Sequence, residues 1–148
     1  MAPQIARPAA DVTNEGWTTQ DGGEASLYNV INEETADDVD YAISSSGPTQ
    51  EVFVTRFDDL DDPGADTGHI LRFRAGKQTA VAADCTLLVE LRQDYVDEGN
   101  QGTLIADYFI ADVPLAFTQY QVPLSEEEAA LITNYEALYL RLVADQPE

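Results

Sequence analysis

The sequence contains few of the residues that most often build catalytic and metal centres. Its 148 residues include one cysteine, Cys85, and one histidine, His69. A single cysteine excludes an internal disulfide framework. A single histidine removes most zinc sites and most histidine-based catalytic mechanisms, and the chain has no G-x-S-x-G nucleophile motif. We therefore expect a protein that is not an enzyme and that needs no cofactor.

Long apolar runs and basic residues are also scarce. No run approaches the ~20 apolar residues that cross a bilayer, and the first residues lack the apolar stretch of a secretory signal, so we expect synthesis in a cytoplasm. Seven Lys and Arg residues, including the single lysine Lys77, stand against 28 Asp and Glu residues, and the formal net charge is -21. Such a surface repels phosphate backbones and anionic membranes, so neither nucleic acid nor a membrane is an expected partner.

The hydrophobic content of 44 % is high enough to form a core despite the charge, and the length fits one domain. Residues 1–25 show no sustained period and contain scattered prolines and glycines, which is typical of an extended segment. We predict an extended N-terminal arm over residues 1–25 and a single domain over residues 26–148.

Short strands separated by turn residues dominate the predicted domain. We expect them at residues 51–57, 69–75, 83–92, 103–111, 116–122 and 138–144. In the third of these, apolar and polar residues alternate, so that Cys85, Leu87, Val89 and Leu91 share one face. Strands at this spacing favour an all-β fold, an antiparallel β-sandwich of jelly-roll or Greek-key type.

One short helix interrupts the strands. Ser125 is followed three residues later by Glu128, which is a capping-box pattern. The acidic residues of this first turn also suit the positive end of the helix dipole. The pattern predicts a helix near residues 125–132.

An acidic loop follows the first of the clear strands. Asp59, Asp61, Asp62 and Asp66 lie close to Gly64, and hard cations such as Ca²⁺ collect carboxylates from one flexible loop. The spacing departs from an EF-hand, because a proline precedes the glycine and no bidentate glutamate follows at the right offset. Acidic loops are usually solvated, so we expect no bound metal and keep these four aspartates as the candidates for one.

Two arginines, Arg72 and Arg74, point to the same side of one predicted strand by the two-residue period. They either pair with nearby acids, which stabilises a surface little, or they form a positive island that docks on an acidic patch of a partner. The many local acids favour pairing, and docking stays open as the second interpretation.

The predicted arm carries Trp17, the single tryptophan, and Arg7 followed by Pro8. Trp and Arg are the residue types that dominate interface hot spots. A tryptophan in a polar segment docks either on its own domain or on a neighbour. We therefore take Arg7, Pro8 and Trp17 as candidate partner-binding residues, with both docking modes open.

Several short motifs follow one another along most of the chain. They are, in order, Arg7-Pro8, Gly16-Trp17, Leu27-Tyr28 to Ile31 and Glu33, Asp37 to Tyr41, Pro63-Gly64, Gly68-His69 to Arg72-Phe73-Arg74, Leu124 to Tyr135, and Leu138 to Arg141. This layout resembles a group of small virion proteins of tailed bacteriophages. The resemblance lies in the order of the pieces, and the chain departs from the group in its low lysine and high acid content.

The resemblance implies a β-sandwich structural protein of the virion that binds the major capsid protein or other virion proteins, with self-association as a further option. We expect a capsid decoration, or cement, protein that stabilises the head by binding neighbouring capsid subunits. One alternative is a neck or tail accessory protein. The other is a virion carbohydrate-binding module, since jelly rolls host such sites; its sugar-stacking residues would be Tyr95, Tyr108, Tyr120 and Tyr139.

Overall fold

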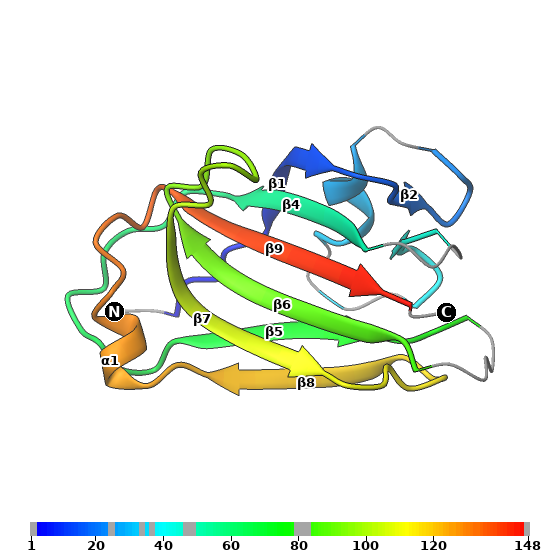
Figure 1. Ribbon diagram of the computed structural model, residues 1–148. Helices are drawn as coiled ribbons and strands as arrows, with labels where there is room; N and C mark the ends of the chain where they lie inside the picture. Colours follow the sequence, from blue (N-terminus) through cyan, green and yellow to red (C-terminus); the bar gives the residue numbers. More distant parts are fainter. Residues whose placement is uncertain are drawn as a thin grey trace.

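The computed structural model describes residues 3–23, 26–32, 35, 38–45, 50–78 and 84–146. Short strands make up most of the regular structure in these ranges, with one 3-10 turn, η1, and one short helix, α1 (Figure 1). In chain order the elements are β1 (Pro8–Asn14), β2 (Thr18–Thr19), η1 (Leu27–Val30), β3 (Ala42–Ile43), β4 (Glu51–Phe57), β5 (Ile70–Ala75), β6 (Thr86–Gln93), β7 (Thr103–Ile110), β8 (Thr118–Pro123), α1 (Glu126–Ala129) and β9 (Leu138–Asp145).

One antiparallel sheet of five strands forms the larger layer, in the order β1-β4-β9-β6-β7. Its inner strands are rich in β-branched and long apolar residues, which pack well on a pleated surface. Strand β9 pairs with β4 on one side and with β6 on the other, so Arg141 lies opposite both Val54 and Glu90. The sheet ends at β1 and β7 and does not close into a barrel.

A two-stranded sheet, β5 with β8, forms the second layer, and β2 pairs with β3 in a further short ribbon. In Figure 1, β5 and β8 lie along the β6 and β7 side of the large sheet, and α1 lies at one end of the sandwich. The prediction of an all-β antiparallel sandwich is therefore confirmed.

The main core lies between the layers. Leu87, Val89 and Leu91 of β6 are all buried on the inner face, as the alternation of that strand predicts, and Cys85 packs against the same cluster. The strand itself begins at Thr86, and residue 83, where we expected it to start, lies outside the described residues. A smaller apolar cluster covers the outer face of the large sheet around Val54, Tyr95 and Val143, with Val52 completing it.

The N-terminal segment differs from the predicted arm. Residues 8–14 form β1, which pairs with β4 and so belongs to the sandwich. Register shifts between Pro8 and Ala10 and between Asp11 and Thr13 interrupt this pairing. Such bulges break the two-residue period, which is why the segment shows no strand pattern in the sequence. The boundary at residues 25 and 26 is therefore not a boundary between an arm and a domain.

The predicted capping box is present at the start of α1. The Ser125 hydroxyl accepts a hydrogen bond from the backbone N–H of Glu128, and the Glu128 carboxylate accepts one from the backbone N–H of Ser125. The helix ends at Ala129 and is shorter than the predicted range. Buried Ala129 and Ile132 anchor the segment to the core.

Candidate functional site

An open groove of about 1650 Å³, which we call the inner groove, lies on the inner side of the five-stranded sheet. Its floor is mainly apolar and includes Leu91 of β6, Phe57 of β4, and Leu140 and Leu142 of β9. Phe57, Leu91 and Leu140 of the floor are only 7–9 % exposed, so little of the floor is in contact with solvent.

Two strand edges flank the inner groove. All of β5 lines the groove, and so do β3, Ser44 and Ser45. Among the described residues, β5 pairs only with β8 and β3 pairs only with β2. Each of these strands therefore has one edge without a strand partner in the described part of the chain, and such edges carry backbone groups able to pair with another strand.

The rim of the groove is held by contacts between β5 and the segment before β3. Arg74 donates from Nε to Oδ1 of Asp38 at 2.8 Å and from Nη2 to Oδ2 at 2.6 Å. This bond raises the pKa of Arg74. Nearby, the ring centroids of Tyr41 and Phe117 lie 5.3 Å apart.

The two arginines singled out by the sequence have different environments. Arg74 pairs with an acid, as the favoured interpretation of the sequence expects. Arg72 is exposed on the groove rim, and no ion pair or hydrogen bond joins its side chain to any described residue. The docking interpretation therefore survives for Arg72. Arg56, on the neighbouring predicted strand, pairs with Asp59 at 2.7 Å.

The three candidate residues of the predicted arm also line the inner groove. Trp17 is 7 % exposed and packs against Phe53, with ring centroids 6.0 Å apart, so it docks on its own sandwich. The backbone of Arg7 pairs with Asp58, whose carboxylate accepts from the Arg7 N–H at 2.7 Å and whose N–H donates to the Arg7 carbonyl at 2.9 Å. Pro8 is the first residue of β1. All five predicted partner-binding residues thus meet at one groove.

Two buried polar atoms of the groove wall have no hydrogen-bond partner among the described residues. They are Nε1 of Trp17 and Nδ1 of His69. The other ring nitrogen of His69, Nε2, lies 2.7 Å from the hydroxyl oxygen of Tyr135. A buried polar atom without a partner is rare in a folded protein. Both atoms are shielded from solvent, so they lie within the packed wall and not on its accessible surface.

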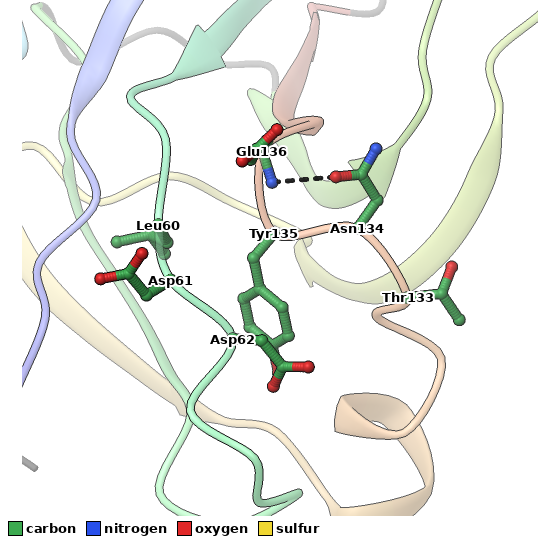
Figure 2. A pocket seen from close by; sticks show the side chains of 7 residues that line it. All are labelled: Leu60, Asp61, Asp62, Thr133, Asn134, Tyr135 and Glu136. Carbon is green, nitrogen blue, oxygen red and sulfur yellow. Dashed lines mark hydrogen bonds between the residues drawn. The ribbon is translucent and has the colours of Figure 1, made fainter.

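The acidic loop lines a smaller cavity of about 360 Å³, which adjoins the inner groove and shares Leu60, Asp61 and Tyr135 with it. Figure 2 shows the carboxylates of Asp61 and Asp62 in this cavity pointing in different directions. Asp62 accepts a hydrogen bond from the backbone N–H of Gly64 at 2.7 Å, and Asp59 pairs with Arg56. Asp66 is exposed. No group of three or more His, Cys, Asp or Glu side chains in the described ranges is placed to hold a metal ion.

The free edge of β7 is a second apolar surface. Phe109 is 60 % exposed, and Leu104 of the same strand is also exposed. Asp107 is the single charged residue in this strand of eight residues. Edge strands usually carry lysine, proline or several charges that prevent pairing with other chains. Strand β7 lacks these protections and contributes no residue to the inner groove.

The tyrosines expected to stack on sugars separate into two pairs. Tyr95 is buried and packs against Tyr139 on the outer face of the large sheet, with ring centroids 5.9 Å apart. Tyr108 and Tyr120 lie between the layers, 5.7 Å apart, and both contact Phe73. The four rings do not form one platform for a sugar.

A network of buried charges on the outer face has no counterpart in the sequence-based predictions. Glu90, only 4 % exposed, accepts hydrogen bonds from Arg92 and from Arg141. Arg141 also holds Glu98 by two bonds of 2.9 and 2.7 Å, which lower the pKa of Glu98. The Tyr95 hydroxyl donates a hydrogen bond to Glu98 at 2.8 Å. Burial raises the pKa of Tyr95 to about 12. Alternation of Glu90 with the apolar residues of its strand is the one signal of this network in the sequence.

Fold and groove together define the class of this protein: an antiparallel β-sandwich whose layers leave an open, largely apolar groove. Compared with known proteins, the chain matches no family model, no curated protein and no solved structure. Among the described residues, no helix has both the length and the apolar character needed to cross a membrane.

Proposed function

We propose that this chain is a structural protein of a tailed-bacteriophage virion and acts as a capsid decoration, or cement, protein. It is made in the host cytoplasm, binds neighbouring subunits of the major capsid protein, and stabilises the head by surface contact. It performs no catalysis and uses no cofactor.

Two separate apolar surfaces on one small acidic molecule carry the proposal. The inner groove lies under β4, β9 and β6, and the exposed edge of β7 lies at the end of the same sheet. Exposed apolar patches on a small protein mark interaction sites. A protein with two such surfaces can contact two neighbours at once, and repetition over a symmetric shell adds avidity to contacts that are weak singly.

The charge of the molecule suits the same role. With a formal net charge of -21, the surface outside the two apolar areas repels other copies and keeps particles from aggregating. Decoration of an outer shell needs this combination, because one side of the protein must bind while the other faces solvent.

A neck or tail accessory protein would use the same kinds of contact, and copy number separates the two roles. A decoration protein fills the equivalent sites of the lattice in hundreds of copies, whereas a neck or tail protein is present in about a dozen or fewer. The carbohydrate-binding alternative is weakened by the separation of its tyrosines, and a glycan array tests it directly.

Quantitative mass spectrometry of purified virions tests the proposal. We expect the chain in the particles, at a copy number comparable to that of the major capsid protein. Purified protein added to expanded shells that lack it should bind and raise the temperature at which the shells break. Absence of the chain from the particles would refute the proposal.

A further inference from the structure

The inner groove is larger than a site for a small molecule. Its volume is about 1650 Å³, whereas sites for drug-sized ligands measure ~300–1000 Å³. Every residue of β5, Ile70–Ala75, lines it. Six residues of extended chain span ~20 Å, so an occupant that follows this wall is a length of polypeptide.

The wall formed by β5 has the chemistry of an incomplete sheet. In an antiparallel ladder, a strand points its backbone N–H and C=O groups alternately to its two neighbours. Strand β8 exchanges backbone hydrogen bonds with one edge of β5. No described strand pairs with the other edge of β5. An extended peptide is the ligand that satisfies such an edge along its whole length, by adding to it as a further strand.

The apolar floor of the groove suits alternate side chains of an added strand. Leu142 and Ala144 of β9 are only partly buried, although their side of the strand faces the core. An added strand points every second side chain to one face. Apolar residues at those positions would cover Leu142 and Ala144 and complete the core.

Polar groups on the groove wall add specificity. Arg72 points outward from β5 and has no ion-pair partner among the described residues. A carboxylate at the cross-strand position of an added strand would pair with it, as opposite charges do across a ladder.

We infer that the inner groove receives an extended segment of a neighbouring virion protein, which adds as a strand to β5. The segment alternates apolar residues with polar ones and carries a carboxylate opposite Arg72. The inference rests on the proposed function, because the donor belongs to the same particle. A second copy of this chain is a poor donor, since two molecules of net charge -21 repel each other. In addition, its alternating apolar segments, as far as the structure describes them, already serve as strands of its own sheets.

Overlapping peptides of about 15 residues, covering every protein of the purified virion, provide the probe. Trp17 is the single tryptophan and lines the groove, so its fluorescence reports occupancy directly. We expect one or a few peptides to change this emission and to protect the amides of residues 70–75 from hydrogen exchange. Arg72→Glu should weaken the bound peptide by about tenfold, whereas the exposed control Arg56→Glu should change affinity less than about twofold.

The same variants added to shells separate this inference from the proposed function. If the chain is present in virions but Arg72→Glu binds shells as wild type does and residues 70–75 stay unprotected, the groove inference is wrong and the proposed function stands. Protection from hydrogen exchange that is confined to the amides of β7 would also overturn the groove inference and leave the proposed function standing. If the chain is absent from virions, the proposed function is wrong, and so is the assignment of the added strand to a neighbouring virion protein. Circular dichroism confirms that each variant is folded, and light scattering detects dimers, which would instead identify a second copy as the occupant.

Discussion

Arg141 is the residue on which the outer face of the large sheet most depends. Its guanidinium joins two carboxylates, one on the neighbouring strand β6 and one on the loop that follows it. We predict that Arg141→Leu strongly destabilises the protein, because it leaves Glu90 buried and removes the two hydrogen bonds that Arg141 donates to Glu98. The leucine keeps the apolar stem but supplies no charge.

The size of the effect follows from burial. The side chains of Arg141 and Glu90 are 11 % and 5 % exposed, and loss of one partner from a buried pair costs ~3–5 kcal/mol. Arg92 remains 2.6 Å from Glu90 in the variant, so we expect the lower end, about 3 kcal/mol. With a urea dependence of ~2 kcal/mol per M, the midpoint of unfolding falls by about 1.5 M.

Equilibrium unfolding in urea, followed by far-ultraviolet circular dichroism at neutral pH, measures this loss. Arg56→Leu is the matched control, because Arg56 and Asp59 are 42 % and 63 % exposed and an exposed pair contributes only ~0–1 kcal/mol. A loss of less than about 1 kcal/mol for Arg141→Leu, equal to that of the control, would show that the network is solvated and would refute this reasoning.

Three further predictions concern pH, backbone strain and the β7 edge. The pKa of Glu98 is depressed in the folded protein, so its contribution to stability is present above its ordinary pKa of 4.5 and is lost as the pH falls below that value; acid titrations should therefore show a smaller loss of stability for Glu98→Gln than for wild type. Gly102 and Gly64 share a φ of +65°, but a Cβ at Gly102 would lie 2.1 Å from a backbone carbonyl oxygen and one at Gly64 would meet nothing within 4 Å. We expect Gly102→Ala to cost about 3 kcal/mol and Gly64→Ala about 1 kcal/mol in urea unfolding, and equal losses would contradict the steric argument. Phe109→Ser should leave the free energy of unfolding within about 0.5 kcal/mol of wild type but weaken binding to shells by about tenfold or more; unchanged binding in a sedimentation assay would remove β7 from the interface.

Local patterns in the sequence predicted much of the fold. The range of β4 agrees with the predicted strand at residues 51–57, and the alternation in β6 identified its buried face. The capping box at Ser125 was also visible, because its two partners are three residues apart. Each of these features depends on residues within one turn or one strand, so a short window of sequence contains the information.

The candidate site was predicted only as separate residues. The sequence marked Arg7, Pro8, Trp17, Arg72 and Arg74 as partner-binding, and the fold brings all of them to the inner groove. It left open whether Trp17 docks on its own domain or on a neighbour, and it did not indicate that β1 would join the sheet through two register shifts. Bulges and docking depend on the partner strand, which no local period reveals.

By itself, the sequence determined which segments become strands and which of their faces are apolar, because side chains alternate along any extended chain. Only the tertiary structure decided which strands became neighbours and how far the second layer extends. Glu98 and Arg141 are 43 residues apart in the chain and meet only after the loop folds back over β9. The inner groove likewise cannot be recognised in a short window of sequence, since the residues that line it come from many elements of the fold. Long-range pairing sets both features, and the free energy of such pairing is shared among elements that are far apart in sequence.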